Sequence, residues 1–150
     1  MAVKLVKPIN HKKVVKITNQ DFEAKMRELR VNSDIAVAVS GGPDSLALMH
    51  LSNRYALNNN INLTVLSIDH GIRAESSKEI VWLEKIAKKN KINFYSTKLE
   101  KKINSSNTLS KARTLRYEAL SKYCNKKKIK FLLTAHHLDD EIENFLMRLI

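Results

Sequence analysis

Residues 35–45 form the stretch that most restricts what this chain can fold into. Residues 35–39 are consecutive apolar residues rich in β-branched side chains, which predicts a strand buried on both faces of a parallel sheet. Gly41 and Gly42 follow at once, and glycine allows a tight turn and a close approach of the backbone to a ligand. Pro43 suits the first turn of a helix, and the N–H groups at such a helix start favour an anion. This order of strand, glycine turn and helix start predicts a phosphate-binding loop.

The loop itself is Ser-Gly-Gly-Pro-Asp-Ser at residues 40–45, and we call it the phosphate loop. No Gly-Lys-Ser/Thr follows, so it is not a Walker motif, and the third glycine of the dinucleotide-binding fingerprint is absent. The structural alternative is an ordinary strand–turn–helix corner whose glycines serve geometry alone. The coincidence of polar, glycine and helix-start residues in consecutive positions favours the phosphate site.

Predicted strands alternate with predicted helices along the chain. We expect strands at residues 35–39, 61–68, 92–97 and 130–135, the third at the edge of the sheet because it is less apolar. Capping boxes and apolar spacing predict helices at residues 18–29, 44–57, 76–90, 109–125 and 142–150. The residues expected on the buried face of the 109–125 helix are Ala112, Leu115, Ala119 and Tyr123. The alternation indicates a doubly wound α/β fold, with a mainly parallel sheet and helices on both faces.

Length and composition narrow the class of protein further. The 150 residues suit one domain at residues 18–150, preceded by a basic arm at residues 1–17. The absence of a long apolar run or secretory signal predicts a cytoplasmic protein without a membrane partner. Cys124 is the only cysteine, so it has no internal disulfide partner. The formal net charge of +12 favours a polyanionic partner such as nucleic acid, although biased nucleotide composition is an alternative source of the lysines.

Two further groups of polar residues follow predicted strands. Asp69 and His70 come directly after the second strand, where a turn beside the phosphate loop would receive the adenosine half of ATP. Arg73 follows them, and its guanidinium suits a phosphate or RNA. The alternative is a simple turn with surface charges. On the 109–125 helix, Arg113 and Arg116 lie one turn apart, either to solubilise an exposed face or to contact the α phosphate or the tRNA backbone.

A cluster of histidines and acids follows the fourth strand. Its spacing matches no zinc signature, and acids capping a helix start would account for the pattern. Asp140 and Glu143 would share one face of the helix expected there, forming a negative pocket for an ammonium group or for the Mg²⁺ of Mg-ATP. Asp139 or His136 would serve the same site.

The motifs together resemble a known family. The phosphate loop resembles the PP-loop of the ATP pyrophosphatases, whose fold is that of the adenine nucleotide α hydrolases and which cut ATP between the α and β phosphates. Four motifs in series resemble bacterial tRNA(Ile)-lysidine synthetases over residues 34–150. They are Ser-Gly-Gly-Pro-Asp-Ser, Asp-His-Gly-Ile-Arg-Ala-Glu-Ser, Ala-Arg-x-x-Arg-Tyr and Ala-His-His-Leu-Asp-Asp-Glu-x-Glu.

The resemblance implies an ATP-dependent ligase that joins free L-lysine to C2 of the wobble cytidine in the CAU anticodon of tRNA(Ile). Its implied cofactors are ATP and Mg²⁺. The implied ATP contacts are Ser40, Gly41, Gly42, Pro43, Asp44, Ser45, Asp69 and His70. Asp44 and Arg113 are the implied catalytic residues, Asp140 and Glu143 the lysine contacts, and Arg73 and Arg116 the tRNA contacts.

The resemblance also leads us to expect a truncated synthetase domain, with a fifth strand and further tRNA-binding domains beyond Ile150. Three other functions stay open. One is a tRNA thiolation enzyme, which would need cysteines that this chain lacks apart from Cys124. The others are a nucleotide-binding domain without catalysis and a basic RNA-binding module.

Overall fold

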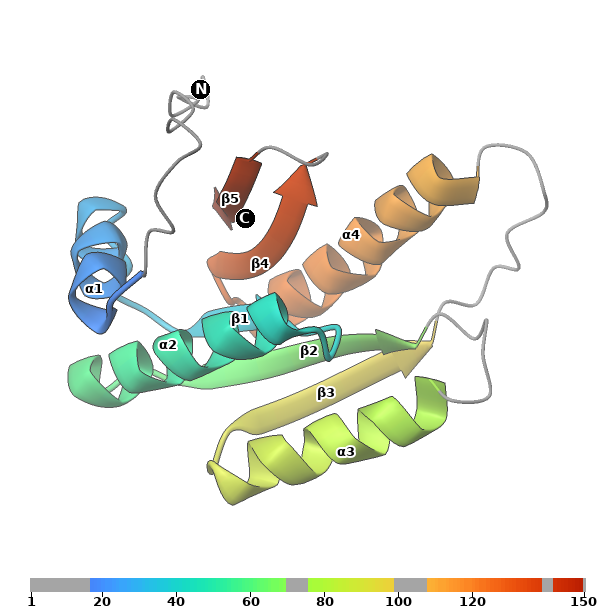
Figure 1. The fold of residues 1–150 in the computed structure, drawn as a ribbon, viewed down its shortest axis with the longest axis horizontal. Helices are drawn as coiled ribbons and strands as arrows, with labels where there is room; N and C mark the ends of the chain where they lie inside the picture. Colours follow the sequence, from blue (N-terminus) through green and yellow to red (C-terminus); the bar gives the residue numbers. More distant parts are fainter. Residues whose placement is uncertain (1–16, 70–75, 99–107, 139–141, 150) are drawn as a thin grey trace.

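The computed structural model describes residues 17–69, 76–98, 108–138 and 142–149. Figure 1 shows these residues folded as helices around a single twisted sheet. The helices are α1 (Asn19–Glu28), α2 (Pro43–Asn59), α3 (Ser76–Lys89) and α4 (Thr108–Lys127). The strands are β1 (Ile35–Ala38), β2 (Leu63–Asp69), β3 (Asn93–Lys98), β4 (Phe131–Leu138) and β5 (Ile142–Leu149).

The strand order is β3-β2-β1-β4-β5, and the first four of these strands run parallel. From β1 the chain moves outward through β2 to β3, and then crosses to β4 on the other side of β1. Strand order therefore reverses between β1 and β4, which is where open parallel sheets bind ligands. The predicted mainly parallel sheet is confirmed, and β3 lies at its edge as expected.

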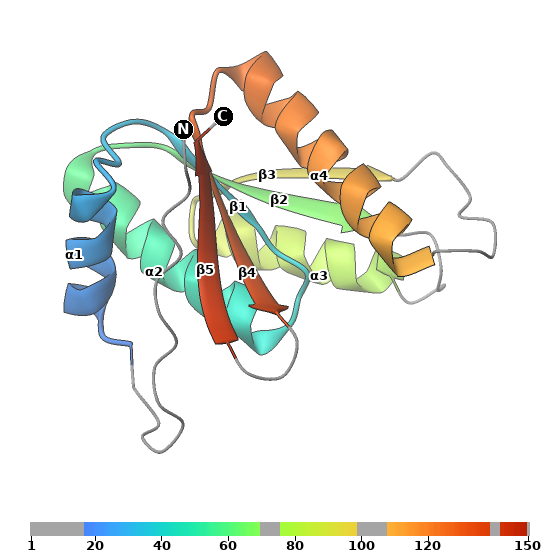
Figure 2. The same ribbon diagram turned by 90° about the horizontal axis from the view of Figure 1, so that it is seen from above.

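Helices cover both faces of the sheet, as predicted (Figure 2). On one face, α1, α2 and α3 pack on alternate strand residues such as Val37, Val65 and Leu133. On the other, α4 packs on the residues between them through Leu120 and Cys124. Side chains alternate between the faces of a strand, so β1 contributes to both layers. Among the described helices, none is long and apolar enough to cross a bilayer.

The face of α4 that packs on the sheet differs from the prediction. Leu120 and Cys124 are buried, whereas Leu115, Ala119 and Tyr123 are half-buried. The buried stripe is therefore rotated by one residue. Periodicity alone did not separate these neighbouring stripes, because small and amphipathic side chains occupy both of them.

The predicted helix at residues 142–150 is wrong. Residues 142–149 form β5, which pairs antiparallel with β4 from Phe131 opposite Leu149 to Leu138 opposite Ile142. Short apolar runs satisfy helical and strand periodicities alike, and backbone pairing with β4 decides between them. The sheet therefore contains a fifth strand, β5, within the segment predicted as a helix, and the expected strand beyond Ile150 stays a prediction.

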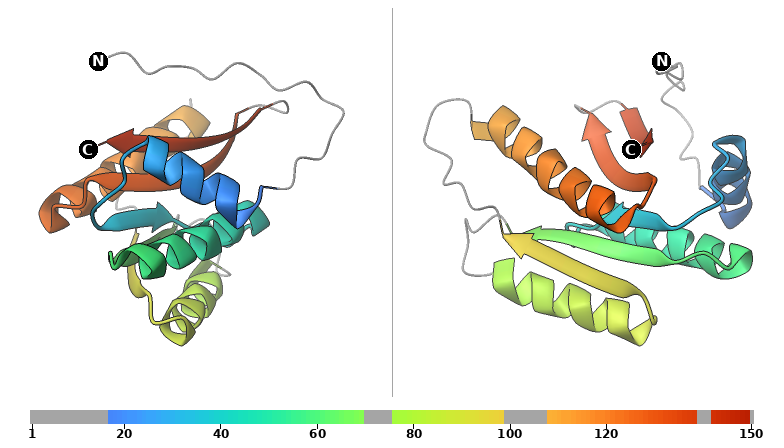
Figure 3. Two further views of the ribbon diagram at one scale, coloured as in Figure 1. Left: turned by 90° about the vertical axis from the view of Figure 1, so that its left-hand side faces the viewer. Right: turned by 180° about the vertical axis from the view of Figure 1, so that it is seen from behind.

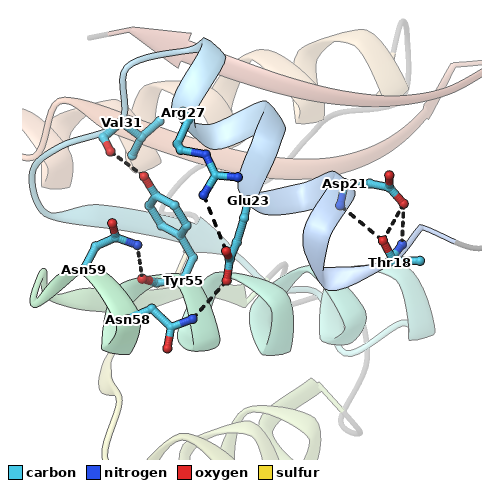
Figure 4. Close-up of polar contacts among 8 residues, drawn as sticks. All are labelled: Thr18, Asp21, Glu23, Arg27, Val31, Tyr55, Asn58 and Asn59. Atoms are coloured by element: carbon cyan, nitrogen blue, oxygen red, sulfur yellow. Dashed lines mark hydrogen bonds and ion pairs between the residues drawn. The ribbon is translucent and has the colours of Figure 1, made fainter.

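Helix α1 is fixed at its start and along its side (Figure 4). The predicted capping box is confirmed, since the Asp21 N–H donates to Thr18 Oγ1 and the Thr18 N–H donates to the Asp21 carboxylate. The Thr18 hydroxyl also donates to the Asp21 carboxylate, at 2.6 Å, and this hydrogen bond together with the one from the Thr18 N–H lowers the pKa of Asp21. Tyr55 of α2, only 3% exposed, packs against α1 and donates its hydroxyl to the Val31 carbonyl at 2.7 Å.

Tyr55→Phe is expected to lower the free energy of unfolding by about 1–2 kcal/mol, because it leaves the buried Val31 carbonyl without its donor. Urea denaturation followed by circular dichroism measures the change. Tyr95→Phe is the matched control, since Tyr95 is 40% exposed and loss of its hydroxyl should change stability by less than about 0.5 kcal/mol. Equal effects of both substitutions would contradict the assigned role of the Tyr55 hydroxyl.

Candidate nucleotide-binding site

The phosphate loop joins the carboxyl end of β1 to the start of α2, as the sequence predicts. Gly41 has a φ of +90°, a conformation that a side chain disfavours. Gly42 is the N-cap of α2 and makes no side-chain capping hydrogen bond, and Pro43 is the first helical residue. Asp44 is exposed in the first turn of α2. The start of the 17-residue α2 therefore follows the end of a central strand, and Gly42 offers no side chain to cap the first N–H groups of the helix.

The buried Ser45 hydroxyl makes hydrogen bonds within the phosphate loop. Its side chain is buried, with 5% of the residue exposed, and its Oγ donates to the Gly42 carbonyl at 2.9 Å. The Ser40 N–H donates to the same Oγ at 3.3 Å, and the Ser40 hydroxyl lies 3.4 Å from it. One hydroxyl thus links both ends of the turn.

Added side-chain atoms at the two glycines would meet few neighbours in the described part of the chain. Among the described residues, a Cβ at Gly41 would meet no atom within 4 Å, and one at Gly42 would meet only Ser40 Oγ at 3.8 Å. The positive φ accounts for glycine at position 41. At position 42 neither the backbone angle of −71° nor a neighbouring atom among the described residues requires glycine, although glycine is also a favoured N-cap residue.

A pocket continues from the phosphate loop between α4 and the carboxyl edge of the sheet. Small residues on β1 and β4 leave room for it, β2 and α4 supply apolar walls, and the half-buried Arg116 supplies a cation. Its lining is Ala38, Val39, Ser40, Ser45, Leu66, Ile68, Arg116, Leu120, Thr134 and Ala135. The pocket therefore combines apolar walls, hydroxyl groups and one cation beside the phosphate loop.

The structure brings together some of the predicted site residues. Ser40, Ser45 and Arg116 line one pocket, and Asp44 lies beside them on α2. Asp69 ends β2 and is buried, on the strand face opposite to the pocket-lining Ile68. Arg113 belongs to α4, but its side chain is not described. His70, Arg73 and Asp140 lie outside the described residues.

The expected pairing of Asp140 and Glu143 on one helical face is wrong for Glu143. That residue lies in β5, opposite His137 of β4. The carboxyl ends of β1 and β4 nevertheless share one edge of the sheet, because these strands are parallel neighbours. The phosphate loop and the end of β4 therefore lie at the same edge of the sheet, while the roles of both acids stay predictions.

Several pocket residues escaped the sequence analysis. They are apolar residues that motif searches pass over: Ala38, Leu66, Ile68, Leu120 and Ala135. Two signals were available. Ile68 alternates with Asp69 at the end of a buried strand, and Leu120 follows Arg116 by four residues on a helix.

The described residues include neither a metal site built from several protein ligands nor a reactive thiol. Within them, no group of three or more histidine, cysteine or acidic side chains could hold a metal ion. Cys124 is fully buried in the apolar layer under α4, and this burial raises the pKa of its thiol to about 11. A thiol with such a pKa is almost wholly protonated near neutral pH, so it is a poor nucleophile and a poor cluster ligand.

The Cys124 thiol is expected to react with Ellman's reagent at pH 8 only after the protein unfolds, because burial keeps it protonated and inaccessible. Absorbance of the released thiolate, with and without urea, measures the reaction. The urea-unfolded chain serves as the positive control, and rapid modification of the native protein would contradict the burial of Cys124.

The fold and this site define an α/β domain with an anion-binding loop at the switch point of its sheet. The chain belongs to the PP-loop domain family, whose model matches residues 10–150. A tRNA(Ile)-lysidine synthase of Rickettsia bellii is 48% identical over 117 residues, covering 78% of this chain and 27% of that protein. A tRNA(Ile)-lysidine synthase of Rickettsia typhi is 41% identical over 133 residues, covering 87% of this chain and 31% of that protein. The chain thus spans less than a third of the length of these relatives.

Two solved structures share the fold. One is a U34-tRNA thiolase with its [4Fe-4S] cluster from Methanococcus maripaludis, with a TM-score of 0.68 and 25% identity, over 81% of this chain and 46% of that one. The other is an NH₃-dependent NAD synthetase from Campylobacter jejuni, with a TM-score of 0.56 and 18% identity. This match covers 79% of this chain and 56% of that one. The second likeness concerns the fold alone.

Proposed function

We propose that this chain is the ATP-using domain of an enzyme that joins lysine to C2 of the wobble cytidine in the CAU anticodon of tRNA(Ile). The phosphate loop at the switch point carries the proposal, because it places two glycines and the first N–H groups of α2 at the carboxyl end of β1, where an anion is favoured. The relatives support the choice of substrates, since those at 41–48% identity are named tRNA(Ile)-lysidine synthases. A cytoplasmic location follows from the same proposal.

In this proposal ATP lies across the carboxyl edge of the sheet. Backbone N–H groups of the phosphate loop bind the phosphates, and the slot between α4 and β2 takes the base against Ile68 and Leu120. Arg116 lies at the same pocket, where ATP and the tRNA would meet. Arg113 follows the start of α4 and would stabilise charge on the α phosphate.

The reaction has two balanced steps. The cytidine O2 attacks the α phosphate, the bond to the β phosphate breaks, and pyrophosphate leaves. The lysine ε-amine then attacks C2, the C2–O bond breaks, and AMP leaves while a base takes the amine proton. Asp140 and Glu143 stay our candidates for orienting the lysine and removing that proton.

The residues at the loop fit a magnesium ion bound together with ATP. Asp44 is an exposed carboxylate beside the phosphate loop, and Mg²⁺ is usually held by one or two carboxylates and substrate phosphates. The ion would neutralise charge on the leaving pyrophosphate. Asp44 would be the residue of this chain that holds the magnesium ion.

A tRNA thiolase is the second candidate, because the solved thiolase shares the fold. The buried Cys124, with its raised pKa, disfavours it. A nucleotide-binding domain without catalysis would bind ATP but release no pyrophosphate.

The test supplies the chain with ATP, Mg²⁺, labelled lysine and a CAU-anticodon tRNA transcript. We expect pyrophosphate release and labelled tRNA, with the whole Rickettsia bellii relative as the positive control. A transcript with a GAU anticodon, which lacks the wobble cytidine, controls for base specificity. ATP binding without pyrophosphate release would overturn the proposal in favour of a non-catalytic domain.

A further inference from the structure

The outer side of α3 carries lysines around an exposed tryptophan. With about 100° between successive helical residues, these side chains fall within one arc of roughly 120°. We call this set the α3 lysine face, and it consists of Lys78, Trp82, Lys85, Lys88 and Lys89, all exposed. The sheet side of the helix is instead formed by the buried Leu83 and Ala87.

The α3 lysine face contains no acid. Glu79 and Glu84, the acidic residues of α3, fall outside its arc on either side. Trp82 is 46% exposed among these lysines, with the neighbouring Val81 at 49%.

A surface of this composition matches RNA. Lysines attract phosphates at any sequence, and an exposed indole stacks on a base whatever its identity. We propose that the α3 lysine face binds the RNA substrate, with its lysines on the phosphates and Trp82 against a base or ribose. The inference rests on the proposed function for the identity of that RNA, and the net charge of +12 agrees with it.

The place of α3 connects this surface with the candidate site. The helix begins at the end of the sheet where β2 finishes, so Lys78 and Trp82 lie in its first two turns near the carboxyl edge (Figure 3). Lys85 and Lys89 continue the face away from that edge. The pocket lies on the α4 face of the sheet and α3 on the other face, so an RNA that contacts both would pass over the carboxyl edge of the sheet.

Trp82 is also a built-in reporter, because it is the only tryptophan of the chain. Titration with the CAU-anticodon transcript, without ATP, should change its fluorescence. Trp82→Ala should weaken binding about tenfold, measured by filter retention, because a stacking contact is lost. Trp82→Phe should restore most of the affinity, since the aromatic face is kept.

The lysines are tested with a triple variant and a control of equal charge. Lys78→Gln, Lys85→Gln and Lys89→Gln together should weaken binding at least about tenfold at 0.1 M salt and lower the slope of log affinity against log salt by about 2–3. The control changes three exposed lysines of α4, Lys122, Lys126 and Lys127, to glutamine. It should weaken binding less than about threefold, and thermal unfolding should show both variants folded.

Equal losses in the two triple variants would overturn the proposal, because net charge alone would then explain binding. Fluorescence that responds to anionic phospholipid vesicles but not to the transcript would also overturn it. ATP binding, measured on the same variants, separates this inference from the proposed function. Suppose that the α3 variants bind ATP, release pyrophosphate and bind the tRNA transcript as wild type does. That result would refute only the RNA-binding role of the α3 lysine face.

Discussion

Asp44→Asn is expected to lower the rate of pyrophosphate release by about 10²–10³-fold while leaving the protein folded. The carboxylate lies exposed in the first turn of α2, beside the phosphate loop, where the proposal places Mg²⁺. Asparagine keeps the shape of the side chain but removes its charge, so the ion loses its protein ligand as charge builds on the phosphates. Steady-state pyrophosphate release at saturating ATP measures the effect.

The matched control is Glu84→Gln, which removes the charge of an exposed acid on α3. It should leave the rate within about twofold of wild type. Loss of the acid at the helix start should change stability by less than about 1 kcal/mol, so thermal unfolding checks that Asp44→Asn is folded. A variant rate within threefold of wild type would remove Asp44 from the catalytic machinery.

Gly42→Ala is expected to lower ATP affinity by at least about tenfold without a matching loss of stability. An added methyl group meets only Ser40 Oγ at 3.8 Å, and the backbone already has a φ of −71°. The fold therefore accepts alanine, with a change of at most about 1 kcal/mol at an N-cap. The methyl group would instead occupy the space that the phosphates need, and calorimetric titration with ATP measures that loss.

Gly41→Ala is the informative comparison, because that residue has a φ of +90°. Alanine there should lower the free energy of unfolding by about 1–2 kcal/mol, with any loss of ATP affinity following from a distorted loop. The two glycines thus separate a backbone requirement from a ligand requirement. Wild-type ATP affinity in Gly42→Ala would show that phosphates do not approach the loop as proposed.

The sheet and the phosphate loop could be predicted because local and tertiary preferences agree there. The apolar run of β1 has a single low-energy place in an α/β domain, and glycines followed by Pro43 fix the turn and the helix start. Thr18 and Asp21 likewise fix the start of α1 through short-range hydrogen bonds. These features depend on residues close in sequence.

The predictions that proved wrong concern features that depend on contacts between residues distant in sequence. Residues 142–149 carry an apolar pattern that suits a helix, and only pairing with β4 makes them a strand. The pocket walls depend on which faces of β2 and α4 meet, so Leu66 and Leu120 could not be found from motifs. The outward direction of Trp82 likewise depends on which side of α3 packs on the sheet.

The central position of β1 has a consequence for how the protein moves. This strand pairs with β2 on one side and β4 on the other, and helices cover both of its faces. Local opening at the edges of the sheet leaves such a strand closed, so its amides exchange with solvent only through global unfolding. The phosphate loop is attached to the carboxyl end of this strand. Binding of ATP at the phosphate loop would also stabilise the folded chain, since ATP at a hundred times its Kd adds about 2.7 kcal/mol to folding stability.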